Sequence, residues 1–301
     1  MKLNHESHPE IIVNLPNFDS MITEIIKQTT ILKEYFQLNF IYYQLVSGHG
    51  LEFDSIKRYN VGDDIRRIDW KKYAKKQELY TRVFEEERQY NIIIVVDVSD
   101  TMLLGTTKHT KTEYASIVAG VIANAANESS DLTALVMTSD KVDIATNLSN
   151  DYSEFITFLT KQENYGGKKD WAKMLNSISS NYSEESIIFI LSDFIDSESL
   201  EEVIPDLCLK FSKVYGIMIR DPTDIELPDN VGQMYLREVH VSKTHLIDLD
   251  QAKEEYKLKT HEEIEKMTDL FHNSGQYFFS MNTKQEFAKS FVIAMGNEKV
   301  M

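Results

Sequence analysis

The stretch Asn91–Met102 reads NIIIVVDVSDTM and decides the fold. Its residues Ile92 to Val96 are five consecutive β-branched residues, an apolar run without alternation. Such a run is typical of a strand that is buried on both faces of a sheet. Ligands of open α/β sheets bind at the carboxyl ends of such strands. We therefore expect a site where the polar segment begins, at Asp97.

A second buried strand has the same form. Ser186–Asp193 reads SIIFILSD and also ends in an aspartate. From residue 91 onward, short apolar segments alternate with amphipathic ones, including 111–127 and 251–273. This alternation predicts an α/β fold with a doubly wound, mostly parallel sheet in three layers.

The chain of 301 residues divides into three predicted regions. Residues 1–47 are expected to form a lead and a helix, since apolar residues recur with helical spacing over 18–36. Residues 48–90 are expected to form a charged, β-rich elaboration packed on the core. Residues 91–301 are expected to form the α/β domain.

The composition excludes several classes of protein. A net charge of −16 disfavours general binding to nucleic acids and anionic membranes, whose phosphates would be repelled. Cys208 is the only cysteine, so no internal disulfide can form. The amino terminus lacks the apolar core of a signal peptide, and no apolar run approaches 18 residues. We expect a cytoplasmic protein that does not span a membrane.

The polar segment after the first strand offers metal ligands. Asp97, Ser99 and Thr101 lie at alternate positions and supply a carboxylate and two hydroxyls, which suit Mg²⁺ or Mn²⁺. If the two buried strands are neighbours, the Asp193 carboxylate joins this group, and a cation would relieve the repulsion between the carboxylates. The alternative is that both aspartates only cap the segments that follow them.

The segment Lys57–Lys76 is basic in an acidic chain, with eight basic and three acidic residues, a formal charge of +5. One interpretation is structural: Arg66 and Arg67 pair with neighbouring aspartates, and Trp70 and Tyr73 are buried beside them. The other is that the patch receives an acidic partner or a nucleic acid. Two aromatic residues give little support for base stacking.

The segment Gly50–Arg88 resembles the signature of the bacterial family known as domain of unknown function 58. The matching positions are Arg58-Tyr59, Gly62–Asp64, Arg66–Trp70 and Ala74. The pattern Asp97-x-Ser99-x-Thr101, with Asp193 ending a later strand, resembles the metal-ion-dependent adhesion site of von Willebrand factor A domains.

These resemblances imply a von Willebrand A-like fold and a non-enzymatic protein-interaction module. Such a module leaves one metal position open for a carboxylate of the partner. Members of the family are commonly associated with MoxR-type AAA+ ATPases, so the resemblance implies an ATPase of this kind as the partner.

One motif departs from the expected pattern. A Gly-Gly-Thr-Asp stretch usually opens a helix before the last metal-bearing strand, but here Gly166–Asp170 reads GGKKD. An ammonium cannot ligate a cation, so either Lys168 or Lys169 neutralises the aspartates directly, or both point away and water fills the position. We expect a degraded metal site, and the sequence leaves open whether it binds Mg²⁺ or Mn²⁺. Partner contacts are expected from Asp100, Lys168 and Lys169, and from Arg66 and Arg67 of the basic segment.

Two other functions are similarly suggested by parts of the sequence. The run IIIVVDVSDT is similar to haloacid-dehalogenase phosphatases, which would make Asp97 a nucleophile in a Mg²⁺-dependent hydrolase. Ser99 stands where the general acid is required and cannot serve as that acid near neutral pH. Nucleic-acid binding through residues 57–76 is the third interpretation, and it predicts affinity that falls steeply with salt.

Overall fold

The computed structural model describes residues 12–13, 16–35, 55–60, 68, 70, 72–73, 77–83, 89–195, 199–237, 244–288 and 290–291. Within these residues, no helix is both long enough and apolar enough to cross a membrane. Arg66 and Arg67 lie outside the described residues.

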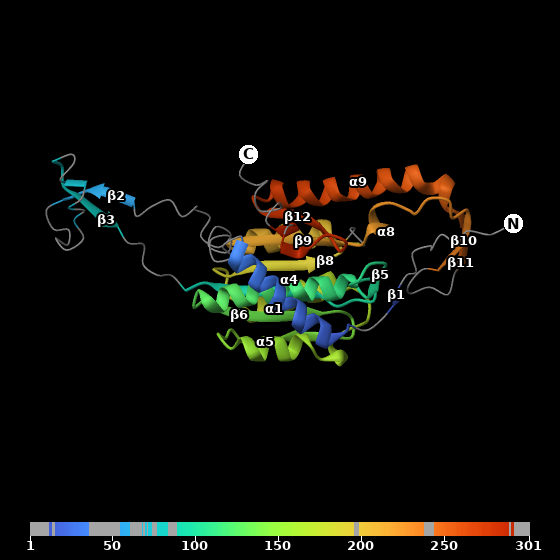
Figure 1. The fold of residues 1–301 in the computed structure, drawn as a ribbon, viewed down its shortest axis with the longest axis horizontal. Helices are drawn as coiled ribbons and strands as arrows, with labels where there is room; N and C mark the ends of the chain where they lie inside the picture. The colour runs from blue at the N-terminus through green and yellow to red at the C-terminus, as the bar shows by residue number, and fades with distance from the viewer. Residues whose placement is uncertain are drawn as a thin grey trace.

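A six-stranded sheet forms the centre of the molecule (Figure 1). Its strand order is β12-β9-β8-β4-β6-β7, and only β7 runs antiparallel to its neighbour. The strands are β4 (Asn91–Asp97), β6 (Leu132–Thr138), β7 (Asp143–Ala145), β8 (Ile187–Ser192), β9 (Lys213–Arg220) and β12 (Tyr277–Asn282). The predicted α/β fold with a mostly parallel sheet is therefore confirmed.

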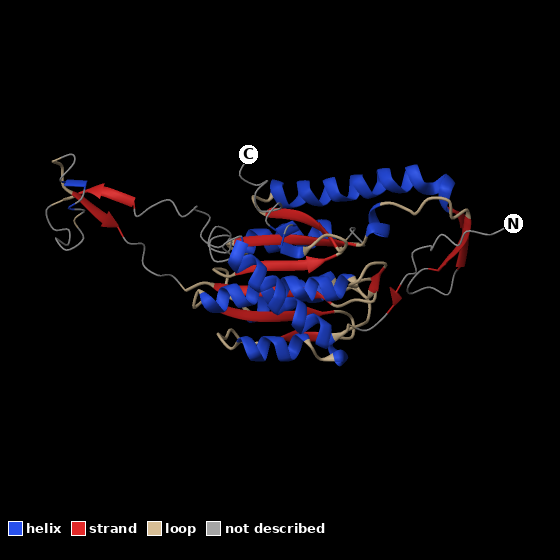
Figure 2. Ribbon diagram, in the orientation of Figure 1, coloured by secondary structure: helices blue, strands red, loops and turns tan. Residues whose placement is uncertain are grey.

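Alternate residues of β4 build two cores, one on each face of the sheet. Ile92, Ile94 and Val96 pack in one core, and Ile93 and Val95 pack in the other. Both sets are buried, as an unbroken apolar run predicts. Helices cover both faces (Figure 2). The first core includes residues of α1 (Phe18–Tyr35), α4 (Lys111–Glu128) and α5 (Tyr152–Leu159), and the second includes residues of α6 (Trp171–Asn181), α7 (Leu200–Lys210) and α9 (Leu249–Asn273).

Helix α4 starts with a capping box, in which Thr110 accepts from the Glu113 N–H and the Glu113 carboxylate accepts from the Thr110 N–H. It is buried along nearly its whole length, because the sheet lies on one side and α1 on the other (Figure 1). This explains why buried residues occur at nearly every position of the helix from Lys111 to Ala126 and not on one face alone. Gly120 leaves room for α1, since a Cβ atom there would lie 2.7 Å from Cδ1 of Ile25.

The smaller elements form three two-stranded ladders and short helices. The ladders are β1 (Ile12–Val13) with β5 (Leu104–Gly105), β2 (Ser55–Arg58) with β3 (Tyr80–Val83), and β10 (Gln233–Arg237) with β11 (Thr244–Asp248). The short helices are η2 (Gln162–Asn164) and α8 (Pro222–Ile225). The pairing of β1 with β5 ties part of the expected amino-terminal lead to the domain.

The expected burial of two aromatic residues in the basic segment is wrong. The exposed fractions are 58% for Trp70 and 41% for Tyr73, whose rings contact each other edge to face. Each ring therefore covers its neighbour instead of entering a core. The three predicted regions and the packing of residues 48–90 on the core stay predictions.

Candidate functional site: a lysine between two aspartates

The site lies where the direction of the sheet's connections reverses. Strands β4 and β8 are adjacent and parallel, and later strands add on the β8 side while β6 and β7 lie on the β4 side. Crevices at such switch points are where ligands bind in doubly wound sheets. Asp97 ends β4 and Asp193 directly follows β8, so both carboxylates lie at this edge, where the sequence places them.

Lys169 bridges the two carboxylates. Its Nζ lies 2.9 Å from Oδ2 of Asp97 and also forms an ion pair with Oδ1 of Asp193. Ser192 donates a hydrogen bond of 2.5 Å to the same Oδ2 of Asp97. The Lys169 side chain is only 9% exposed, and its ammonium lies 5.5 Å from the centre of the Trp171 ring. An ammonium group thus lies between the two expected metal ligands.

A second lysine neutralises the other side of Asp193. Lys111 Nζ lies 2.9 Å from Oδ2 of Asp193 and 3.0 Å from Oδ2 of Asp224. Lys111 is 1% exposed and Asp193 is fully buried. We call Asp97, Lys169, Asp193, Lys111 and Asp224 the charge network.

The pKa values of these groups follow from their pairing. Burial disfavours the charged form of both lysines, but the neighbouring carboxylates outweigh this effect and raise both lysine pKa values. The carboxylates are those of Asp193 and Asp97 for Lys169, and those of Asp193 and Asp224 for Lys111. Burial likewise opposes ionisation of Asp193, yet Lys111 and Lys169 lower the pKa of this carboxyl well below its usual range. These three groups are therefore charged at neutral pH.

The Gly166-Gly167 turn directs Lys169 toward the strands. Both glycines have positive φ, of 107° and 102°, which other residues rarely adopt. The turn is fastened to the end of β4, since the Gly166 N–H donates to the Val98 carbonyl and the Gly167 N–H donates to Oδ1 of Asp100. Asp100 thus has a structural bond in addition to its expected partner role.

Lys168 points elsewhere. Its backbone N–H donates to Oδ1 of Asp140 at 2.6 Å, and the residue is exposed. Of the two lysines in the motif, only Lys169 enters the charge network.

The two hydroxyl residues bond to each other. Ser99 Oγ and Thr101 Oγ1 are 3.2 Å apart, and the Ser99 N–H donates to Oδ1 of Asp97 at 3.0 Å. The Asp193 carboxylate also accepts from the N–H of Ile195, at 3.3 Å. The capping interpretation therefore describes some of the bonds, although the ion pairs go beyond it.

Phe194 holds Asp193 in place through a backbone conformation that is unusual for a phenylalanine. Its φ is +49°, in the left-handed region. Its N–H donates to Ser192 Oγ at 3.0 Å, and its ring stacks on Trp171. Backbone strain of this kind concentrates at functional sites and persists only where the surroundings enforce it.

A divalent cation does not fit the expected ligands in this arrangement. Lys169 lies where the cation would bridge the carboxylates, and it would repel a second positive charge. The described part of the chain also holds no group of three or more His, Cys, Asp or Glu residues suited to a metal.

Sequence reasoning missed three members of the site: Lys111, Asp224 and Ser192. Lys111 did leave a signal, because a cation in the first turn of a helix opposes the helix dipole and needs a nearby anion. Asp224 left none, since its partner is more than a hundred residues away. Ser192 reads simply as part of the apolar strand.

Comparison with known proteins places this site in a family. The family model described as "Protein of unknown function DUF58" matches residues 55–266. The chain belongs to this family. The resemblance seen in Gly50–Arg88 is therefore confirmed.

The relatives and solved structures found are distant. The uncharacterized proteins Mb1516 of Mycobacterium bovis and Rv1480 of Mycobacterium tuberculosis are each 25% identical over 213 residues, which cover 69% of this chain and 67% of theirs. Two solved structures each match 69% of this chain and 99% of their own. One is the conserved hypothetical protein BatB from Bacteroides thetaiotaomicron, with a TM-score of 0.43 and 13% sequence identity. The other is an aerotolerance-related membrane protein from Bacteroides fragilis, with a TM-score of 0.46 and 11% sequence identity.

Proposed function

We propose that this protein is a non-enzymatic protein-interaction module of the von Willebrand A type, in which Lys169 takes the place of the metal ion. The observation that carries the proposal is the bridge from Lys169 to Asp97 and Asp193 at the switch point of the sheet. The position is the one that ligands favour in this architecture. Both carboxylates form their ion pairs with lysines of the same chain.

The bonding of Asp97 favours binding over catalysis. Its Oδ2 accepts from Ser192 and pairs with Lys169, and its Oδ1 accepts from the Ser99 N–H. A nucleophile needs an accessible lone pair, whereas this carboxylate is 6% exposed. The phosphatase alternative is therefore the weaker one.

The partner we propose is a MoxR-type AAA+ ATPase, as the family resemblance implies. The compartment we propose is the cytoplasm, which the net charge of −16 favours. Lys169 already bonds both carboxylates and lies 3.4 Å from Ser192 Oγ, so its three N–H donors are occupied. The exposed Lys168 next to it is the cation that a partner can reach. We therefore place the first contact at Lys168, with an acidic surface of the ATPase.

The test is a binding measurement between the full chain and the purified MoxR-type ATPase of the same organism. Because charge reversal at an interface costs about 1.4 kcal/mol or more, we expect Lys168→Glu to weaken binding by about tenfold or more. Lys259→Glu on α9 is the matched control, since Lys259 is also exposed, and it should change affinity less than about twofold.

Two results would contradict the proposal. One is the absence of binding by the unmodified chain. The other is loss of binding after this chain alone has been treated with EDTA and freed of it before mixing, because a site with Lys169 as its cation has no need of a divalent metal.

A further inference from the structure

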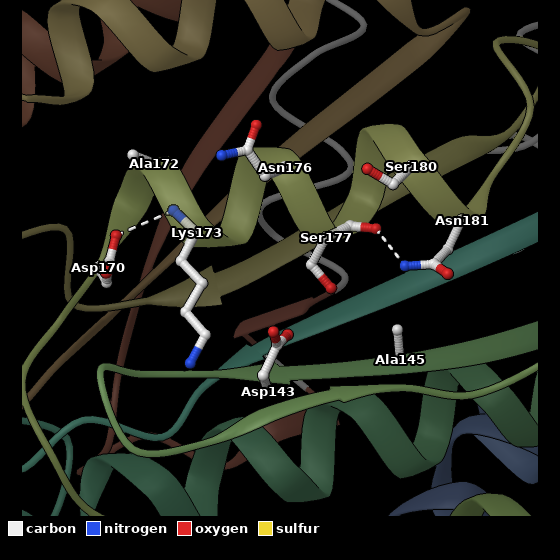
Figure 3. Close-up of a pocket in the computed structure, with 9 residues that line it drawn as sticks. All are labelled: Asp143, Ala145, Asp170, Ala172, Lys173, Asn176, Ser177, Ser180 and Asn181. Carbon is white, nitrogen blue, oxygen red and sulfur yellow. Dashed lines mark hydrogen bonds between the residues drawn. The ribbon is translucent and has the colours of Figure 1, made fainter.

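We propose that the outer edge of β7 and the facing side of α6 form a groove that is a second binding site. Its ligand is an extended peptide segment carrying a basic residue. This groove lies at the edge of the sheet and is independent of the function proposed above. Figure 3 shows it between strand and helix, with Lys173 and Ser177 directed from α6 toward the strand. Its volume is about 680 Å³.

The edge offers unpaired backbone groups. Strand β7 has a single neighbour, β6, in the described structure. The Ser139 N–H donates to the Val142 carbonyl, and the Thr146 N–H donates to the Leu135 carbonyl. Because ladder bonds of an antiparallel pair fall on alternate residues, Asp143 and Ala145 direct their N–H and C=O groups away from β6. These groups point to a partner that is itself a strand.

The opposite wall is polar and fixed. Lys173 donates to the carbonyls of Ser139 and Val142, at 2.9 and 3.2 Å, which ties α6 to the start of β7. The remaining lining residues are small or polar and include Asn176, Ser177, Ser180 and Asn181. Such a wall suits a hydrophilic segment better than an apolar helix, because each buried polar group would need a hydrogen bond.

Charge selects the segment further. The lining holds Asp143 and Asp170 against Lys173, a formal charge of −1, in a chain of net charge −16. Asp143 is exposed, and it is the first residue of β7, so its carboxylate lies beside the backbone groups that would pair with the peptide. A lysine or arginine of the bound segment can therefore reach its carboxylate.

The short edge also has a protective explanation, since three-residue edge strands limit aggregation. That explanation requires no groove and no flanking polar wall. The two explanations differ in what the outward amides do when peptide is present.

A phage-displayed library of random 12-residue peptides, selected on the full chain, provides the probe. We expect enriched peptides with at least one basic residue. In amide exchange followed by NMR, bound peptide should slow exchange at Asp143 and Ala145 by about tenfold or more and leave Ile144 unchanged, because only the outward groups gain a partner.

Two variants make the test specific. Ala145→Pro removes an outward N–H that the sheet does not use, and Ser177→Arg fills the groove from α6 without altering the strand; each should weaken peptide binding by about tenfold or more. Thr157→Arg, on the exposed side of α5, is the control and should leave binding unchanged. Failure to enrich any peptide, protection at other amides, or binding by both variants that equals that of the wild type would overturn the proposal.

Discussion

Lys169 is the residue on which the chemistry of the site depends. Its ammonium group reduces the repulsion between the two carboxylates at the ends of β4 and β8 by pairing with both of them. Removing it leaves five oxygen-bearing side chains at one edge, those of Asp97, Asp193, Ser99, Thr101 and Ser192. Oxygen ligands of this kind suit Mg²⁺.

We therefore expect Lys169→Ala to gain Mg²⁺ binding while losing about 3 kcal/mol of stability without metal, because one partner of a buried ion pair is gone. Isothermal titration calorimetry with Mg²⁺ measures the first effect and urea unfolding the second. The wild type should bind Mg²⁺ weakly or not at all.

The controls separate the two adjacent lysines. Lys168→Ala should bind no Mg²⁺, since Lys168 lies outside the charge network, and adding Asp97→Ala to Lys169→Ala should remove the gained binding. Tight Mg²⁺ binding by the wild type would refute the assignment of Lys169 as the internal cation.

At the scale of elements, the packing of α9 on the sheet depends on one glycine of β9. A Cβ atom on Gly216 would lie 2.6 Å from Cζ of Phe271 on α9 and 2.6 Å from Cδ2 of Phe278 on β12. Both rings are buried and contact each other, with centroids 5.1 Å apart. Neither ring can move without disturbing the other.

Gly216→Ala is therefore expected to destabilise the fold by about 1–3 kcal/mol through overpacking. Thermal and urea unfolding measure the loss. Phe271→Leu creates space beside the new methyl group. Gly216→Ala should therefore cost less stability in the Phe271→Leu background than in the wild type. Simple additivity of the two changes would show that the glycine has another role.

Elements with strong local patterns could be predicted, and those that depend on distant partners could not. The apolar runs ending in Asp97 and Asp193 predicted two buried parallel strands, and these are neighbours in the sheet. The structural interpretation of the basic segment predicts a buried Trp70 beside ion pairs, but its exposure depends on tertiary contacts that the local sequence does not encode. The role of Lys111 depends in the same way on Asp193, 82 positions away.

For the whole molecule, acid stability should follow the paired carboxyl groups. The pKa of Asp193 is lowered by its two lysines, and the pKa of Glu24, despite burial, is lowered from 4.5 to about 2 by Gln28 and Lys27. A carboxyl with a lowered folded pKa contributes stability that is complete above its unfolded pKa and is lost as pH falls through the folded pKa. Stability should thus fall below about pH 4.

Melting temperature measured from pH 7 down to pH 2 checks this expectation. Asp193→Asn is the informative variant: it should be less stable at pH 7 and lose less stability on acidification, because its amide does not titrate. An acid profile parallel to that of the wild type would assign the loss to other carboxyl groups.

A positive charge that is built into the polypeptide has a consequence for control. Every folded copy of the chain contains one Lys169 ammonium at the carboxyl ends of β4 and β8, and no ion has to be acquired there after synthesis. Changes in the concentration of magnesium or manganese therefore leave the bridge from Lys169 to the two carboxylates unchanged. For the docking proposed above, control by metal supply would then be ruled out, which leaves the amount of each protein and the state of the partner as means of control.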